Sequence, residues 1–210
     1  MANFIYSRVT IEPSEAMDKI CDMIENMPQS EYGKETTTVV KTFYTEEELK
    51  KPYNNGETEY PITDTGVKHS WLYDNVGTKW ITIGVDDDIK IESPSYIPDG
   101  FLIKLYSLCV NDFEDVRITC KWYDEGETEC GTALIWNGIY AEDQYYIEEE
   151  YEDTELGNEK KWDDITEKQD RMFHLCEEAI ETEDFNFPIS KVKKIANVKY
   201  EMVTNCYPFQ

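Results

Sequence analysis

Carboxylates and tyrosines crowd one short stretch of the chain, residues 141–156, AEDQYYIEEEYEDTEL. Eight of its sixteen residues are acidic and none is basic. In an extended chain, alternate side chains lie about 6.8 Å apart on one face. Such rows of carboxylates imitate a phosphate backbone in spacing and sign. A protein that normally holds nucleic acid through Lys and Arg is therefore the partner that this stretch suits.

The side chains that we expect to contact this partner are Glu142, Asp143, Tyr146, Glu148, Glu149, Glu150, Tyr151, Glu152, Asp153 and Glu155. The interleaved tyrosines add contact area at a low entropic cost. A second interpretation stays open. The stretch is then a solvated edge whose charge prevents aggregation, paired with the lysine-bearing tail at 191–199.

Three tryptophans and a lysine form a second set of candidates for binding a small ligand: Trp71, Lys79, Trp80 and Trp122. A cleft lined by them would suit a small molecule or the substrate of an enzyme. The alternative for Thr78–Trp80 is a packed strand start, because Gly77 permits a tight turn and Trp80 can bury a large surface.

No motif for a known reaction is present in the sequence. It contains no P-loop, G-x-G-x-x-G or G-x-S-x-G. Asp86–Asp88 lacks the alternating pattern of a calcium loop. None of the six cysteines has C-x-x-C spacing and the two histidines are far apart, which argues against zinc. We therefore expect a protein that is not an enzyme, with no catalytic residue, metal or cofactor, and with reduced, buried thiols.

The net charge of -25 on 210 residues restricts the partners further. Nucleic acid and anionic membranes would both repel the chain, so we expect it to bind neither directly. No apolar run approaches the roughly twenty residues that span a bilayer. No secretory signal is visible. These features predict a cytoplasmic protein, a monomer or small homo-oligomer, that binds a basic protein.

The periodicity of apolar residues predicts the helices and strands that position the candidate side chains. They are a strand at 3–11, a helix at 14–27, a strand at 36–44, a hairpin of 79–85 and 89–92, a helix at 101–109, strands at 116–123, 132–136 and 139–146, a helix at 162–180 and a strand at 198–202. Thr45 and Glu48 fit a capping box, and His69 is expected in a strand. The order predicts an α+β fold, an antiparallel sheet with helices packed on one face.

We expect the chain to divide into three parts. Residues 1–147 form the main α+β domain, and residues 148–161 form an acidic linker or exposed edge. Residues 162–210 form a C-terminal helix and strand that pack on the same domain.

Two clusters of residues resemble motifs of a known family. One is WLYDNVGTKW at 71–80, and the other joins Ser93-Pro94 to WYDEG at 122–126 and Gly131. With the opening MAN and RVTI at 8–11, they resemble the YubB-type ferredoxin-like proteins of conjugative plasmids and phages, over roughly residues 1–138. The chain departs from that pattern at Val76, where the family usually has Trp. The resemblance implies a ferredoxin-like sheet and a mobile-element origin, and no established activity.

Charge and resemblance together lead to one functional hypothesis. The chain is an acidic phage or mobile-element protein that binds and inhibits a host nucleic-acid-handling or defence protein by nucleic-acid mimicry. Two alternatives stay open. One is a small-ligand-binding protein or enzyme that uses the Trp-lined cleft, and the other is a structural or assembly protein of a virion.

Overall fold

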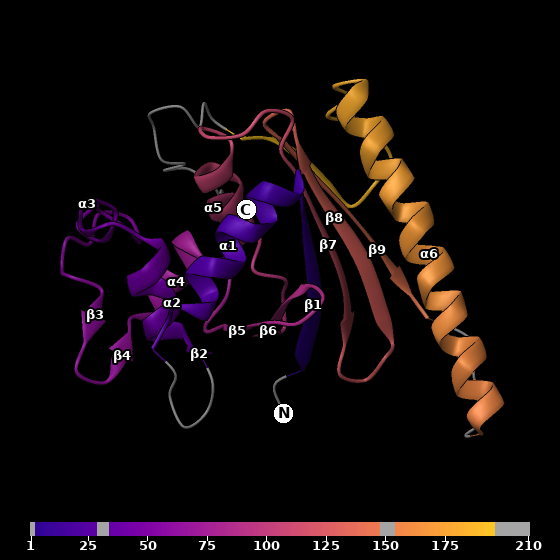
Figure 1. Cartoon of the computed structure of the whole chain (residues 1–210), viewed down its shortest axis with the longest axis horizontal. Helices are drawn as coiled ribbons and strands as arrows, with labels where there is room; N and C mark the ends of the chain where they lie inside the picture. Colours follow the sequence, from indigo (N-terminus) through magenta and orange to yellow (C-terminus); the bar gives the residue numbers. More distant parts are fainter. Residues whose placement is uncertain (1–2, 29–33, 148–153, 196–210) are drawn as a thin grey trace.

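A computed structural model describes residues 3–28, 34–147 and 154–195, and its centre is an eight-stranded antiparallel sheet (Figure 1). The strands of this sheet are β1 (Phe4–Glu12), β2 (Lys34–Glu35), β5 (Thr82–Val85), β6 (Ile89–Pro94), β7 (Arg117–Asp124), β8 (Glu129–Trp136), β9 (Ile139–Tyr146) and β10 (Lys191–Lys194). Their order across the sheet is β10-β9-β8-β7-β1-β6-β5-β2. A separate pair is formed by β3 (Ile62–Thr63) and β4 (Gly66–Val67).

The helices are α1 (Ser14–Glu25), α2 (Thr36–Phe43), α3 (Glu46–Leu49), α4 (His69–Asn75), α5 (Asp99–Cys109) and α6 (Glu155–Glu181). Chain order β1-α1-β5-β6-α5-β7 and spatial order β7-β1-β6-β5 are those of a ferredoxin-like βαββαβ unit. The predicted α+β class is therefore confirmed. The β8–β9 hairpin and β10 extend the sheet beyond β7.

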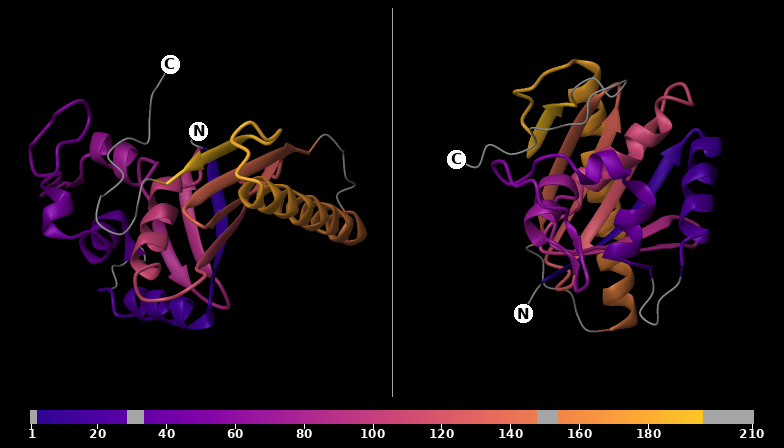
Figure 2. Two further views of the ribbon diagram at one scale, coloured as in Figure 1. Left: turned by 90° about the horizontal axis from the view of Figure 1, so that it is seen from above. Right: turned by 90° about the vertical axis from the view of Figure 1, so that its left-hand side faces the viewer.

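The sheet is covered on both faces, whereas the sequence predicted helices on one face. Figures 1 and 2 show α1 and α5 on one side and α6 on the other. Both faces are covered because the middle of β8 carries apolar side chains on both faces of the sheet. Ala133 and Ile135 belong to the main core, while Leu134 packs with Cys176 and Ile180 of α6. A strand with two apolar faces needs cover on both of them.

Residues 36–44 were predicted as a strand, and this is wrong, because residues 36–43 form α2. The β-branched residues suggested a strand, but such propensity is weak against tertiary packing. In α2 the side chains of Val39, Val40 and Phe43 are buried together at helical spacing. His69 likewise begins α4 and is not in a strand. The Thr45–Glu48 capping box is confirmed at the start of α3.

The long helix α6 begins earlier than its apolar stripe suggested. Thr154 caps it, and the Thr154 side chain accepts a hydrogen bond from the Gly157 backbone N–H at 3.1 Å. Residues 155–161, predicted as part of an acidic linker or edge, are instead its first turns. Residues 148–153 and the strand expected at 198–202 lie outside the described residues.

Candidate functional site

The beginning of the acidic stretch lies on β9, beside the lysines of β10. Glu142 is opposite Lys191 in the antiparallel register. The Asp143 carboxylate accepts hydrogen bonds from the Ser190 backbone N–H at 3.2 Å and from its hydroxyl at 3.0 Å. Both residues therefore lie beside the C-terminal segment, as in the second interpretation, although among the described residues Glu142 forms no ion pair with a lysine. Tyr146 is exposed at the end of β9.

The candidate tryptophans pack in different places. Trp71 is fully buried and meets the Tyr44 ring edge-on with a centroid distance of 5.0 Å. Trp80 packs on Phe4 at 5.6 Å, and Lys79 is exposed beside it. Complete burial in the core removes Trp71 from any surface that a ligand could reach. A cleft lined by all three rings is therefore wrong, and of these residues Trp122 lines a cavity on the α5 side of the sheet.

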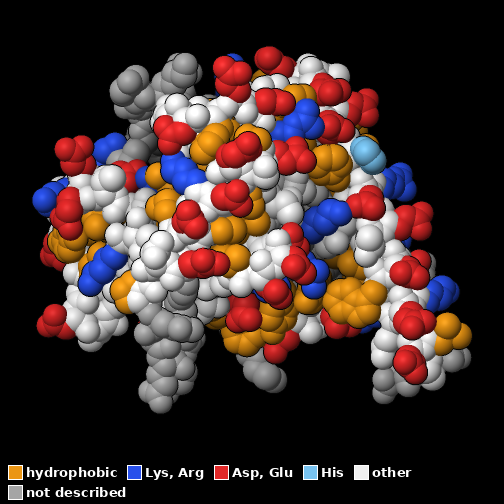
Figure 3. Space-filling view, in the orientation of Figure 1, with side chains coloured by type: hydrophobic (Ala, Val, Ile, Leu, Met, Phe, Trp, Pro, Cys, Tyr) orange, Lys and Arg blue, Asp and Glu red, His pale blue; other side chains and the backbone are white. Residues whose placement is uncertain are grey.

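A regular row of carboxylates runs along the first half of α6. Glu155, Glu159, Asp163 and Glu167 are all exposed and follow one another at four-residue spacing, so we call them the α6 carboxylate row. Four residues of helix rise about 6 Å. The first buried residue of α6 is Ile165, and the start of the helix extends past the end of β9 (Figures 1 and 2). Figure 3 shows carboxylates following this helix on one side of the molecule.

The α6 carboxylate row is not neutralised by the described part of the chain. No ion pair or hydrogen bond joins these four carboxylates to another described residue, whereas nearby Lys161 pairs with Glu127 at 2.5 Å. Like charges at this spacing destabilise a helix by about 0.2–0.5 kcal/mol per pair. Two apolar side chains lie among the carboxylates, Leu156 with 75% of its surface exposed and Trp162 with 39%. The helix end thus presents uncompensated charge together with exposed apolar surface.

The row was missed by the sequence analysis except for Glu155. Residues 148–161 were predicted as an acidic linker or exposed edge, so no helical spacing was expected there. The i, i+4 recurrence of acidic residues from 155 to 167 was the signal that would have found it.

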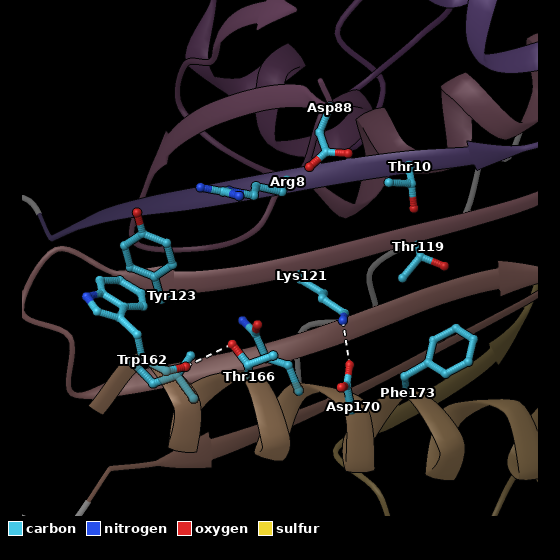
Figure 4. Close-up of a pocket in the computed structure, with 12 residues that line it drawn as sticks. Arg8, Thr10, Asp88, Thr119, Lys121, Tyr123, Trp162, Thr166, Asp170 and Phe173 are labelled. Carbon is cyan, nitrogen blue, oxygen red and sulfur yellow. Dashed lines mark hydrogen bonds and ion pairs between the residues drawn. The ribbon is translucent and has the colours of Figure 1, made fainter. Parts of the chain in front are cut away.

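A groove of about 670 Å³ lies between α6 and the outer face of β1 and β7 (Figure 4). We call it the sheet-face groove. On one side the Tyr123 ring meets Trp162 edge-on at 5.0 Å. On the other side Lys121 forms an ion pair with Asp170 at 2.6 Å. Arg8 projects over the strands between them, and it forms no ion pair among residues 3–28, 34–147 and 154–195.

A second cavity of about 620 Å³ lies on the α5 side of the sheet, where aromatic and acidic side chains gather. We call it the tyrosine–acid cavity. Its aromatic and charged lining residues are Tyr73, Tyr96, Asp99, Trp122, Glu129, Glu142, Tyr146 and Lys191. Three of them, Trp122, Glu142 and Tyr146, were named from the sequence as candidate binding residues.

Two carboxylates of this cavity have pKa values shifted in opposite directions. Burial opposes ionisation of Asp99, but the ammonium groups of Lys193 and Lys191 outweigh it and lower the pKa of Asp99. The Asp99 Oδ2 accepts from Lys191 at 2.7 Å and from Lys193 at 3.0 Å. Burial raises the pKa of Glu142, although the Tyr140 hydroxyl donates to its Oε2 at 2.7 Å.

The five described cysteines are free thiols, and Cys109, Cys120, Cys130 and Cys176 are buried as predicted, whereas Cys21 is only partly buried and Cys206 lies outside the described residues. Burial raises the pKa of Cys109 and Cys130 to about 11 and that of Cys120 and Cys176 to about 12. At neutral pH these four are protonated and are poor nucleophiles.

No group of three or more His, Cys, Asp or Glu side chains in the described part of the chain is arranged to hold a metal ion. In the Asp86–Asp88 turn, Asp86 instead pairs with Lys90 at 2.6 Å. Within the same residues, no helix is long and apolar enough to cross a membrane.

Comparison with family models, with curated proteins and with solved structures found no match to this chain. The function must therefore be argued from the geometry itself.

Proposed function

We propose that this chain is a non-enzymatic acidic protein of a phage or other mobile element that binds a basic protein of its host. The observation that carries the proposal is the α6 carboxylate row, a line of exposed charge in the first half of α6 that no described residue compensates. A protein that handles nucleic acid, including one used in defence, presents Lys and Arg where phosphates bind. The row would meet those cations in the host cytoplasm and exclude nucleic acid from them, which would inhibit the partner.

The overall charge supports such an encounter. A field from a net charge of -25 would steer a cationic partner toward the protein and raise the association rate at low salt. Leu156 and Trp162 would add apolar contact beside the charges. Trp is enriched among the interface residues that contribute most to the binding free energy. The proposed recognition surface is thus a helix and not the extended strand predicted from the sequence, while the kind of partner is the same.

The test neutralises the α6 carboxylate row with Glu155→Gln, Glu159→Gln, Asp163→Asn and Glu167→Gln in one variant. We expect host proteins captured from lysate at low salt to be lost at high salt, because screening weakens exposed charge pairs. We also expect the variant to bind the captured protein at least tenfold more weakly in a purified assay. The native chain should displace nucleic acid from that protein.

A matched control removes the same charge elsewhere. Asp18→Asn, Asp64→Asn, Asp87→Asn and Glu114→Gln neutralise four exposed carboxylates away from α6. Because the loss of net charge is equal, a general electrostatic effect would weaken both variants alike. Equal weakening, or full binding by the α6 variant, would remove the support for this proposal.

A second candidate function, binding of a small anionic ligand, is favoured by the sheet-face groove. Arg8 lies between Lys90 of β6 and Lys121 of β7 in the strand register. Both lysines have carboxylate partners, but Arg8 has none among the described residues. The planar fork of Arg suits phosphate or carboxylate. Tyr6 and Tyr123, with ring centroids 5.5 Å apart, offer a platform for a planar group.

For this candidate we expect AMP, more than inorganic phosphate, to raise the melting temperature of the native chain. Arg8→Gln should abolish the shift, and Arg171→Gln, an exposed arginine on α6, should leave it unchanged. Absence of a shift with the native chain at millimolar AMP would count against a nucleotide-like ligand.

A further inference from the structure

The tyrosine–acid cavity is formed by segments that are distant in the sequence. Tyr73 comes from α4, Asp99 from the start of α5 and Trp122 from β7, while Glu142 and Tyr146 come from β9. Glu142 lies in the middle of β9, and Tyr146 is its last residue, just before the segment that connects β9 to α6. The cavity is therefore joined by chain continuity to the helix that carries the α6 carboxylate row.

Negative charge dominates this cavity. Three carboxylates, Asp99, Glu129 and Glu142, line it against the single ammonium of Lys191. Lys191 and Lys193 are already engaged by Asp99. Neither Glu129 nor Glu142 forms a salt bridge within the described residues. A ligand cation would thus find two carboxylates not yet paired with a cation.

Aromatic rings supply the rest of the lining. Tyr96 has 65% of its surface exposed and Tyr146 has 58%, a large exposure for side chains of this size. The face of an aromatic ring attracts a cation placed within about 6 Å of its centroid. The protein uses this interaction beside the cavity, where Lys193 lies 4.8 Å from the Tyr140 ring centroid. Tyrosines next to unpaired carboxylates suit a lysine or arginine side chain.

Trp122 gives an independent indication of a ligand. Its side chain lines the cavity with only 4% of the residue exposed. Its Nε1–H is buried and has no hydrogen-bond partner among the described residues. A buried donor left without an acceptor costs about 1–3 kcal/mol. A peptide carbonyl would reach this donor only if the ring shifts, because the Nε1 atom is closed to solvent and lies against Gly131.

We infer that the tyrosine–acid cavity binds a lysine or arginine side chain of a basic peptide segment, with Glu142 pairing its charge and Tyr96 and Tyr146 packing on it. This inference rests on the proposed function, since it names where the basic partner is anchored. The α6 carboxylate row supplies steering, and the partly enclosed cavity supplies a specific contact.

The probe for this inference is Nα-acetyl-lysine methylamide, and acetyl-norleucine methylamide is its uncharged counterpart. Titration followed by NMR of the tryptophan indole N–H signals should show saturable binding of the lysine probe and none of the norleucine probe. Glu142→Gln, which keeps an acceptor for the Tyr140 hydroxyl, should weaken binding at least tenfold. Tyr96→Ala should weaken it severalfold.

Two matched controls accompany these variants. Glu114→Gln removes an exposed carboxylate far from the cavity lining, and Tyr60→Ala removes another exposed tyrosine. Both should bind the lysine probe as the native chain does. Affinity for the probe should also fall as the pH drops through the raised pKa of Glu142, and so at a higher pH than for an ordinary glutamate.

The outcomes separate this inference from the proposed function. If the lysine probe does not bind, or binds equally to Glu142→Gln, the cavity is not a cation site, while the α6 result can still hold. If the probe binds as expected but neutralising the α6 carboxylate row leaves the partner bound, the cavity stands and the role of α6 falls. The inference also requires Glu142→Gln to weaken binding of the whole partner.

Discussion

Replacing Asp99 with asparagine is expected to lower the free energy of unfolding by about 2 kcal/mol, because it removes a buried carboxylate that accepts charge-assisted hydrogen bonds from two partly exposed lysines. Only 4% of Asp99 is exposed, and its Oδ2 receives the ammonium groups of both Lys191 and Lys193. These contacts tie β10 to the start of α5. Urea denaturation followed by far-UV circular dichroism measures the change.

The control for this prediction is Asp112→Asn, which breaks the exposed pair with Lys19 at 2.6 Å. Exposed pairs contribute about 0–1 kcal/mol, so this variant should unfold almost like the native chain. Equal effects of the two substitutions would show that the buried pair adds no special stability.

The pH dependence of the Asp99 variant follows from the direction of the shift. The pKa of Asp99 is lowered in the folded state. Its contribution is therefore complete above the unfolded value of about 3.9 and is lost as the pH falls through the lower folded value. The stability difference between the native chain and Asp99→Asn should shrink in acid below about pH 4. A difference that grows in that range would contradict the assigned ion pairs.

Replacing Gly131 with alanine is the second substitution with a large expected effect. An added Cβ would lie 2.4 Å from Cε2 of Trp122 and 2.5 Å from its Cζ2 and Nε1. Overpacking of this kind costs about 1–3 kcal/mol, because the ring must leave its position. We expect a lower melting temperature together with altered binding of the lysine probe, since the displaced Trp122 ring lines the tyrosine–acid cavity.

Gly84→Ala is the matched control. Gly84 also lies in a strand, and a Cβ there meets nothing within 4 Å. Where the backbone fits, replacing Gly by Ala stabilises by about 0.4–1 kcal/mol, chiefly by reducing the freedom of the unfolded chain. Opposite signs for the two substitutions are therefore expected. If Gly131→Ala were as stable as the native chain, the close packing of Trp122 on β8 would be wrong.

The middle of the sheet could be predicted from the sequence because its strands alternate cleanly. In β7, Ile118, Cys120 and Trp122 are buried and Lys121 points the other way, as the pattern of residues 116–123 indicated. The capping box at Thr45 was predictable for a similar reason, since it depends on groups within four residues. Both features arise from local chain geometry.

Burial in the tertiary structure decided the elements that the sequence mispredicted. Val39 and Val40 favour strands by type, yet they lie in α2 because the core accepts them on a helix face. The start of α6 was hidden because none of residues 155–164 is fully buried, so no apolar stripe marks this part of the helix. Trp71 and Trp122 were grouped by residue type, and only one of them lines a described cavity.

The sequence by itself determined the large negative charge, the antiparallel sheet and most of its strands, because charge is a property of composition and alternation is a property of neighbouring residues. The tertiary structure alone decided which carboxylates are compensated. Asp99 and Lys191 are separated by 92 residues and meet only when β10 joins the sheet. The α6 carboxylate row stays unpaired by described residues because the helix end extends beyond β9. Pairing depends on distances between remote segments, which packing fixes and local sequence does not.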